Sequence, residues 1–300
     1  STRASHTIVP TNAGSDSRSI VSIGREFNCF TPPVCRTPVC VAVRMARPIQ
    51  TATRTWVVAT VRGMAETSEP RAFAQTGFVP PPGATEILLV RHGASAAHVE
   101  GESFDLVDGH GDPPLAPEGV EQAELAAQRL IATGERIAAV YVTSLQRTAQ
   151  TAAPLVERLG IEPVVVADLR EVFLGDWEGG EFRRRVADGD PIAQQMYLEQ
   201  RWDVIPGGEP AHQFENRVRR GIQRIASAHP DELAVAVVHG GVIGQVMNIA
   251  TGSTGFAFTG AANASISHIV VAAEDHWIVR CWNDTSHLSP TFGVPNEPLI

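Results

Sequence analysis

The spacing of apolar positions changes near residue 83. Before it, no period of 2 or 3.6 residues is sustained, whereas after it continuous aliphatic runs predict buried strands and amphipathic stretches predict helices. The predicted strands cover residues 86–90, 137–144, 162–171 and 233–241. The predicted helices cover residues 115–134, 145–160, 214–230 and 242–252, and a hairpin over 264–282 turns at Glu274–Asp275. Strands that alternate with helices indicate an α/β fold, a sandwich around a mostly parallel sheet.

The first 82 residues are rich in Ser, Thr, Arg and Pro and end in the stiff run FVPPPG. We therefore divide the chain into an extension without a fold of its own, residues 1–82, and one domain, residues 83–300. Met64 opens a stretch that would serve as a natural start, so we expect much of 1–63 to be tag, fragment or upstream translation. Three cysteines of the extension match no common zinc-ligand spacing: Cys29, Cys35 and Cys40.

Composition narrows the classes of function. The chain has 300 residues and a net charge of −9, divided into +5 for residues 1–82 and −14 for residues 83–300. An acidic domain disfavours nucleic acid as a partner, so an anionic substrate needs a local cluster of cations. All 24 basic residues are arginine, which excludes Schiff-base lysine chemistry and a lysine phosphate loop. No apolar run reaches the length of a membrane span, and a single domain cysteine, Cys281, fits a reducing, cytoplasmic location.

Charged side chains lie where the predicted strands end. The first strand is followed by Arg91 and His92, and the second by Arg147. Glu171 stands at the end of the third strand, and His239 stands near the end of the fourth. Carboxyl ends of parallel strands meet at one edge of a sheet, so we expect these five side chains in one pocket. Guanidinium groups bind phosphate oxygens, a neutral imidazole is a nucleophile, and a carboxylic acid can protonate a leaving alcohol. The set therefore suits a phosphate monoester.

Several motifs around these residues resemble one family in the same order. They are LLVRHGAS, GDPPLAPEGVEQA, TSLQRTAQTA, LREVFLGDWEG, VVHGGVI and WNDTSHL. Together they are similar to the histidine phosphatase superfamily, in the branch that contains cofactor-dependent phosphoglycerate mutase and related phosphatases. The resemblance covers about residues 84–289 and implies a three-layer α/β/α sandwich with a mostly parallel central sheet.

The resemblance also implies a role for each residue of the predicted pocket. His92 would be the nucleophile that forms a phosphohistidine, while Arg91, Arg147 and His239 would bind the phosphoryl group. Glu171 would protonate the leaving group and then activate water. No metal or cofactor would be required, and the partner would be a small-molecule phosphate ester. The sequence is compatible with a homodimer but contains no pattern that specifies one.

One position departs from the family pattern. The family often has an asparagine six residues after the nucleophile, where this chain has His98. We treat Ser95 and His98 as candidate substrate contacts, and Asp108 and His110 of the same loop as weaker candidates.

Two further assignments have stated alternatives. Glu178 and Asp176 compete with Glu171 as the acid, and the motif favours Glu171. The arginine run 183–185 is expected to be a solvated helix face, with attraction of an anionic substrate tail as the alternative.

Three functions remain open, in order of preference. The first is a phosphatase, favoured by the run GDWEGG, by the short stretch between Glu171 and His239, and by PGGEP at 206–210. The second is a phosphoglycerate mutase that returns the same phosphoryl group to a bound product. The third is a catalytically idle phosphate-binding module, which the presence of all five site residues disfavours.

Overall fold

The computed structural model describes residues 72–289. Its main sheet has the strand order β5-β4-β6-β1-β7-β8. The first four of these strands are parallel, and β7 and β8 form an antiparallel hairpin on β1. The sheet is therefore mostly parallel, as predicted. The strands are β1 (Thr85–Arg91), β4 (Ile137–Val142), β5 (Val164–Val165), β6 (Leu233–Val238), β7 (Ile266–Ala273) and β8 (His276–Asp284).

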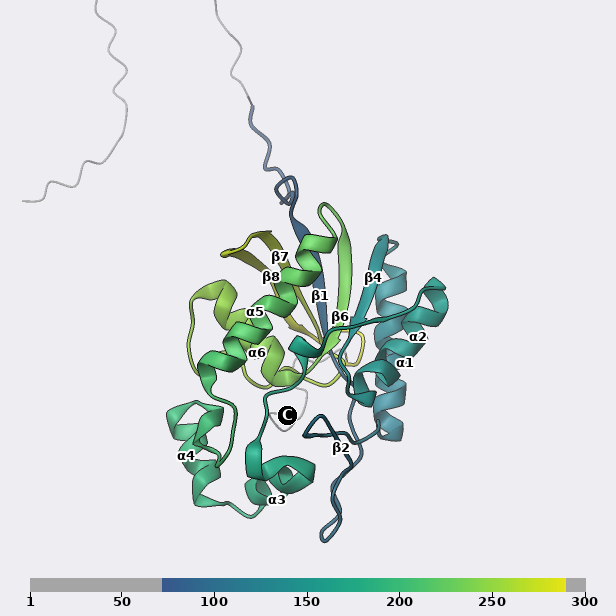
Figure 1. Ribbon diagram of the computed structural model, residues 1–300. Coiled ribbons are helices and arrows are strands. Elements are labelled where there is room, and N and C mark those ends of the chain that lie inside the picture. Colours follow the sequence, from purple (N-terminus) through teal and green to yellow (C-terminus); the bar gives the residue numbers. More distant parts are fainter. Residues whose placement is uncertain (1–71, 290–300) are drawn as a thin grey trace, which may run out of the picture. The chain divides into compact units, whose positions relative to one another are not determined.

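Helices cover both faces of this sheet (Figure 1). One face packs against α1 (Pro117–Ala132) and α2 (Gln146–Leu159), and the other against α5 (Ala211–Ala228) and α6 (Gly240–Thr251). Successive side chains of β6 serve the two cores alternately, Val235 and Val237 on the α1/α2 side and Ala236 and Val238 on the other. All four are buried, which explains the uninterrupted apolar run. The predicted three-layer sandwich is confirmed.

The third predicted strand is the least accurate part of the prediction. Only Val164 and Val165 pair with β4, at the edge of the sheet, and both side chains are exposed. The chain then bends through the 3-10 helix η1 (Ala167–Leu169), which turns Leu169 into the core. The apolar run predicted a long strand because Val166 and Leu169 are apolar. Both side chains are buried, but they lie after the end of β5, where the chain bends.

A set of short elements that the sequence pattern did not predict lies past the carboxyl ends of the parallel strands, where Figure 1 labels β2, α3 and α4. Three aromatic side chains of this region pack together. The ring centroid of Phe182 lies 6.1 Å from that of Trp177 and 6.2 Å from that of Trp202. The elements are β2 (Leu106–Val107), β3 (His110–Gly111), η2 (Gly175–Gly180), α3 (Glu181–Ala187), α4 (Pro191–Glu199) and η3 (Trp202–Val204).

The segment before β1 forms neither helix nor strand over residues 72–81. The rest of the predicted extension, including Met64 and the three clustered cysteines, lies outside the described residues. Within residues 72–289, no helix is long and apolar enough to cross a bilayer.

Candidate active site

The end of β1 places His92 at the carboxyl edge of the sheet. Arg91 is in register with Val238 of β6, and the backbone N–H of His92 donates to the Val238 carbonyl at 2.9 Å. The imidazole is buried, and its Nδ1 lies 2.8 Å from the Gly93 carbonyl. A carbonyl only accepts, so Nδ1 carries the proton and Nε2 keeps its lone pair. His92 therefore presents Nε2 as a nucleophile.

A close backbone contact fixes the turn that follows. A Cβ on Gly93 would lie 2.4 Å from the carbonyl oxygen of Gly119 in α1, so no side chain fits there. The Gly93 N–H donates to Thr151 Oγ1 of α2 at 3.0 Å. Two helices thus hold the segment after His92 in one position.

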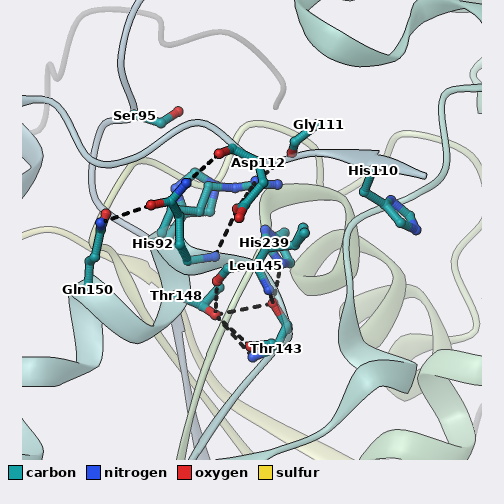
Figure 2. A network of polar contacts seen from close by, with 12 residues as sticks. His92, Ser95, His110, Gly111, Asp112, Thr143, Leu145, Thr148, Gln150 and His239 are labelled. Atoms are coloured by element: carbon teal, nitrogen blue, oxygen red, sulfur yellow. Dashed lines mark hydrogen bonds and ion pairs between the residues drawn. The ribbon is translucent and has the colours of Figure 1, made fainter. Parts of the chain in front are cut away.

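His239 follows β6 and lies beside His92, with ring centroids 5.2 Å apart. Its Nε2 lies 3.0 Å from Thr143 Oγ1, which in turn lies 3.1 Å from Thr148 Oγ1 (Figure 2). Its Nδ1 is buried and has no hydrogen-bond partner among the described residues. An unsatisfied buried nitrogen costs about 1–3 kcal/mol, which a ligand oxygen can relieve. The hydroxyl pair therefore orients a ring whose other nitrogen is left for a ligand.

Two buried guanidinium groups flank the histidines. Arg91 is 1% exposed and donates Nη1 to the Ala261 carbonyl. Arg147 is 7% exposed, donates Nη1 to the Gly111 carbonyl at 3.0 Å, and lies 3.9 Å from Asp112 Oδ1. Burial lowers the pKa of Arg147 to about 10, so this side chain remains cationic at neutral pH. These charges suit an anion with several oxygens.

The same surroundings keep both imidazoles neutral. Burial, then the charges of Arg147 and Arg91, hold the pKa of His92 well below its ordinary value. Burial and Arg147 do the same to the pKa of His239. His92 therefore keeps its lone pair as the pH falls below the ordinary histidine range.

Glu171 lies in the segment between η1 and η2, against the first turn of α6. Its Oε1 accepts from the Val172 N–H at 2.9 Å, and its Oε2 accepts from the Gly241 N–H at 3.1 Å. Burial raises the pKa of this carboxyl group, although both hydrogen bonds and the charge of Arg147 oppose the change. A raised pKa favours the protonated form that a general acid needs.

The sequence profile of the histidine phosphatase superfamily (branch 1) matches residues 87–285. This chain belongs to that family.

Similar proteins agree with this assignment. Phosphoglycerate mutase-like protein 4 of Arabidopsis thaliana is 33% identical over 209 residues, which cover 69% of this chain and 88% of that protein. A metal-independent phosphoserine phosphatase of the same organism is 32% identical over 68% of this chain and 84% of its own length. A structure of mycobacterial glucosyl-3-phosphoglycerate phosphatase with VO3 has a TM-score of 0.55 and 26% identity, over 67% of this chain and 99% of that one. The protein is therefore a phosphatase, a hydrolase of phosphoric monoesters.

The pocket of this histidine phosphatase contains most of the predicted residues. His92, Ser95, His110, Arg147 and Glu171 line it. Arg91 and His239 are not among the lining residues, although the His239 ring lies 5.2 Å from that of His92. Burial and nearby arginines lower the pKa of His110 to about 4.

Two loop candidates do not line this pocket. His98 Nε2 donates to the Glu102 carbonyl of its own loop at 2.8 Å. Its ring packs edge-on against Phe104. Asp108 forms an ion pair with Arg170 at 2.5 Å. His98, which we expected to contact the substrate, therefore does not line the pocket with the other site residues.

The rivals of Glu171 differ from it in their contacts. Glu178 also lines the pocket, but its two oxygens accept from the N–H groups of Leu174 at 2.9 Å and Gly111 at 2.7 Å, which ties η2 to β3. Asp176 is not among the lining residues. Among residues 72–289, no group of three or more His, Cys, Asp or Glu side chains is arranged to hold a metal ion.

One charged residue of the pocket wall comes from the arginine run 183–185, for which the sequence favoured a solvated face over contact with a substrate. Arg183, the first residue of the run predicted as a solvated face, lines the pocket, and its Nη2 donates to Ser95 Oγ at 2.7 Å. The signal in the sequence was the arginine run itself, which does not distinguish its three members.

Proposed function

We propose that this histidine phosphatase hydrolyses small-molecule phosphate monoesters through a phosphohistidine on Nε2 of His92. The observation that carries the proposal is a neutral, buried imidazole with a free lone pair in a pocket that also contains Arg147 and Glu171. The names of two similar proteins specify phosphate monoesters, phosphoserine for one and glucosyl-3-phosphoglycerate for the other. A single exposed cysteine among the described residues supports a reducing, cytoplasmic location.

In the first step, the lone pair of His92 Nε2 forms a bond to phosphorus while the bond from phosphorus to the ester oxygen breaks. Arg91, Arg147 and the unpartnered Nδ1 of His239 bind the phosphoryl oxygens on which negative charge develops. The proton of Glu171 passes to the departing oxygen, so the product leaves as a neutral alcohol.

In the second step, water attacks the phosphohistidine. The ionised carboxylate of Glu171 takes a proton from this water as its oxygen bonds to phosphorus and the bond from phosphorus to Nε2 breaks. Inorganic phosphate leaves, and both His92 and Glu171 return to their starting protonation states. The carboxyl group of Glu171 thus donates a proton in the first step and accepts one in the second.

The test is to trap the intermediate. With ³²P-labelled substrate and rapid acid-free quenching in denaturant, the wild type should yield labelled protein whose phosphate is lost in acid and stable in base. His92→Ala should give neither turnover nor label, whereas His212→Ala, on the exposed side of α5, should behave as the wild type. Turnover by His92→Ala at the wild-type rate would refute the proposal.

The same preparation separates the phosphatase from a mutase. We expect transfer to water without a bisphosphoglycerate primer. Stimulation by the primer, with the phosphoryl group recovered in phosphoglycerate, would support the mutase instead.

A further inference from the structure

Three consecutive arginines at the start of α3 have different partners. Arg184 forms an ion pair with Glu181 at 2.7 Å, and Arg185 forms one with Asp190 at 2.9 Å. Arg183 has no carboxylate within ion-pair distance among the described residues, although its side chain is largely removed from solvent. Burying a cation without an acid to match it is unfavourable, so this arrangement requires an explanation.

Neutral groups hold the Arg183 side chain at the pocket. Its Nη1 donates to the Ala96 carbonyl and its Nη2 to Ser95 Oγ, both at 2.7 Å, and the guanidinium lies 5.5 Å from the centre of the Phe104 ring. A guanidinium has five N–H donors, and these contacts use two of them. The remaining donors belong to a side chain whose position is already fixed, which lowers the entropic cost of binding a ligand.

The charge of Arg183 interacts electrostatically with the groups of the phosphate site. It is one of the charges that lower the pKa of His92 and also of Arg147, although burial is the largest cause for both. His92, Arg147 and Arg183 thus line one pocket.

We propose that Arg183 binds a carboxylate of the substrate, so that this enzyme selects phosphate monoesters that carry a carboxylate a few atoms from the ester oxygen. The inference rests on the proposed function and adds a substrate class to it. A planar guanidinium matches a planar carboxylate in a bidentate pair. Among the lining residues, Arg183 is the one arginine that the phosphoryl chemistry leaves unassigned, and Glu178 is the one unassigned acid. A substrate anion would also supply the counter-charge that the protein does not.

The experiment uses substrate pairs that differ mainly in the carboxylate. O-phospho-L-serine is compared with O-phosphoethanolamine, and 3-phosphoglycerate with glycerol 3-phosphate. In the wild type we expect kcat/KM to favour the carboxylate member of at least one pair. Arg183→Met should reduce that preference about 10- to 100-fold, the range for loss of a charge-assisted bond. Arg183→Gln keeps a donor for the Ala96 carbonyl and replaces the methionine variant if that variant folds poorly. It should reduce the preference by a similar factor.

Arg184→Met is the matched control, because it removes an arginine from the same helix turn but only breaks surface ion pairs. It should leave the preference of the wild type unchanged. Equal losses on both members of a pair in the Arg183 variants would assign Arg183 a structural role and overturn the inference. A wild type that hydrolyses phosphate monoesters with no carboxylate preference would overturn it too, while a wild type inactive on all monoesters would refute the proposed function itself.

Discussion

Gly241→Ala tests the position of the catalytic acid without changing the acid. A Cβ at residue 241 would lie 2.5 Å from Glu171 Oε1, closer than the 3.0 Å that real Cβ contacts respect. Relief to between 3.0 and 3.4 Å requires the carboxylate to move by about 0.5–0.9 Å. The obstacle is the end of a flexible side chain and not backbone, so the carboxylate should move and α6 should stay. Alanine is a better helix residue than glycine by up to about 1 kcal/mol, so the substitution should not lower the stability of α6 itself.

A displacement of this size is large for proton transfer. A misplacement of ~1 Å can reduce a rate by ~100-fold, so we expect kcat on an alkyl phosphate to fall about 10- to 100-fold. p-Nitrophenyl phosphate needs little help in releasing its phenolate and should lose much less. The assay is kcat on both substrates, together with the melting temperature. Unchanged kcat on the alkyl phosphate would refute the assignment of Glu171, and equal losses on both substrates would indicate a distorted phosphate site.

Three further predictions concern the same pocket. Because burial raises the pKa of Glu171, its acid form persists above the ordinary range, and turnover of alkyl phosphates should fall as pH rises through that raised pKa; Glu171→Gln should abolish this alkaline limb and leave a lower, flatter profile. Because His92 is held neutral, loss of activity on the acid side should follow protonation of the substrate near pH ~6 and not of His92, so substrates with different second ionisations should shift that limb. Thr143→Val removes the hydroxyl at His239 Nε2 and should lower kcat/KM about tenfold on all monoesters, with weaker phosphate inhibition; an unchanged inhibition constant would show that the hydroxyl does not orient the ring.

Most of the sandwich could be predicted because burial determines its sequence pattern. β6 is buried on both faces and reads as six apolar residues, and α5 has its buried side chains Phe214, Val218, Ile222 and Ile225 at helical spacing. β5 was overestimated, since an apolar run does not reveal whether its residues are buried in a strand or in a bend. The elements over the pocket could not be predicted because they are short, and α3 buries only Phe182, which is too little to give a helical pattern.

The candidate site divides in the same way. Arg91, His92 and His239 lie at the ends of parallel strands, so topology alone brings them together. Arg183 could not be distinguished from its two neighbours, because its direction depends on where α3 begins. The turn before α3 uses Gly180 at φ 110°, where a Cβ would collide with the His98 ring, and this geometry has no readable signal in the sequence.

The position of β1 in the sheet has a consequence for biosynthesis. β1 lies in the middle, and both of its neighbours, β6 and β7, come from the far end of the chain. A nascent chain therefore carries β1 with both edges unpaired until almost the whole domain has been made, which delays folding and leaves an apolar strand open to association. The same delay means that His92 and His239 are neighbours only once the central pairing exists. Phosphatase activity during refolding should thus appear with the last long-range step, and an enzymatic assay would report the completed domain.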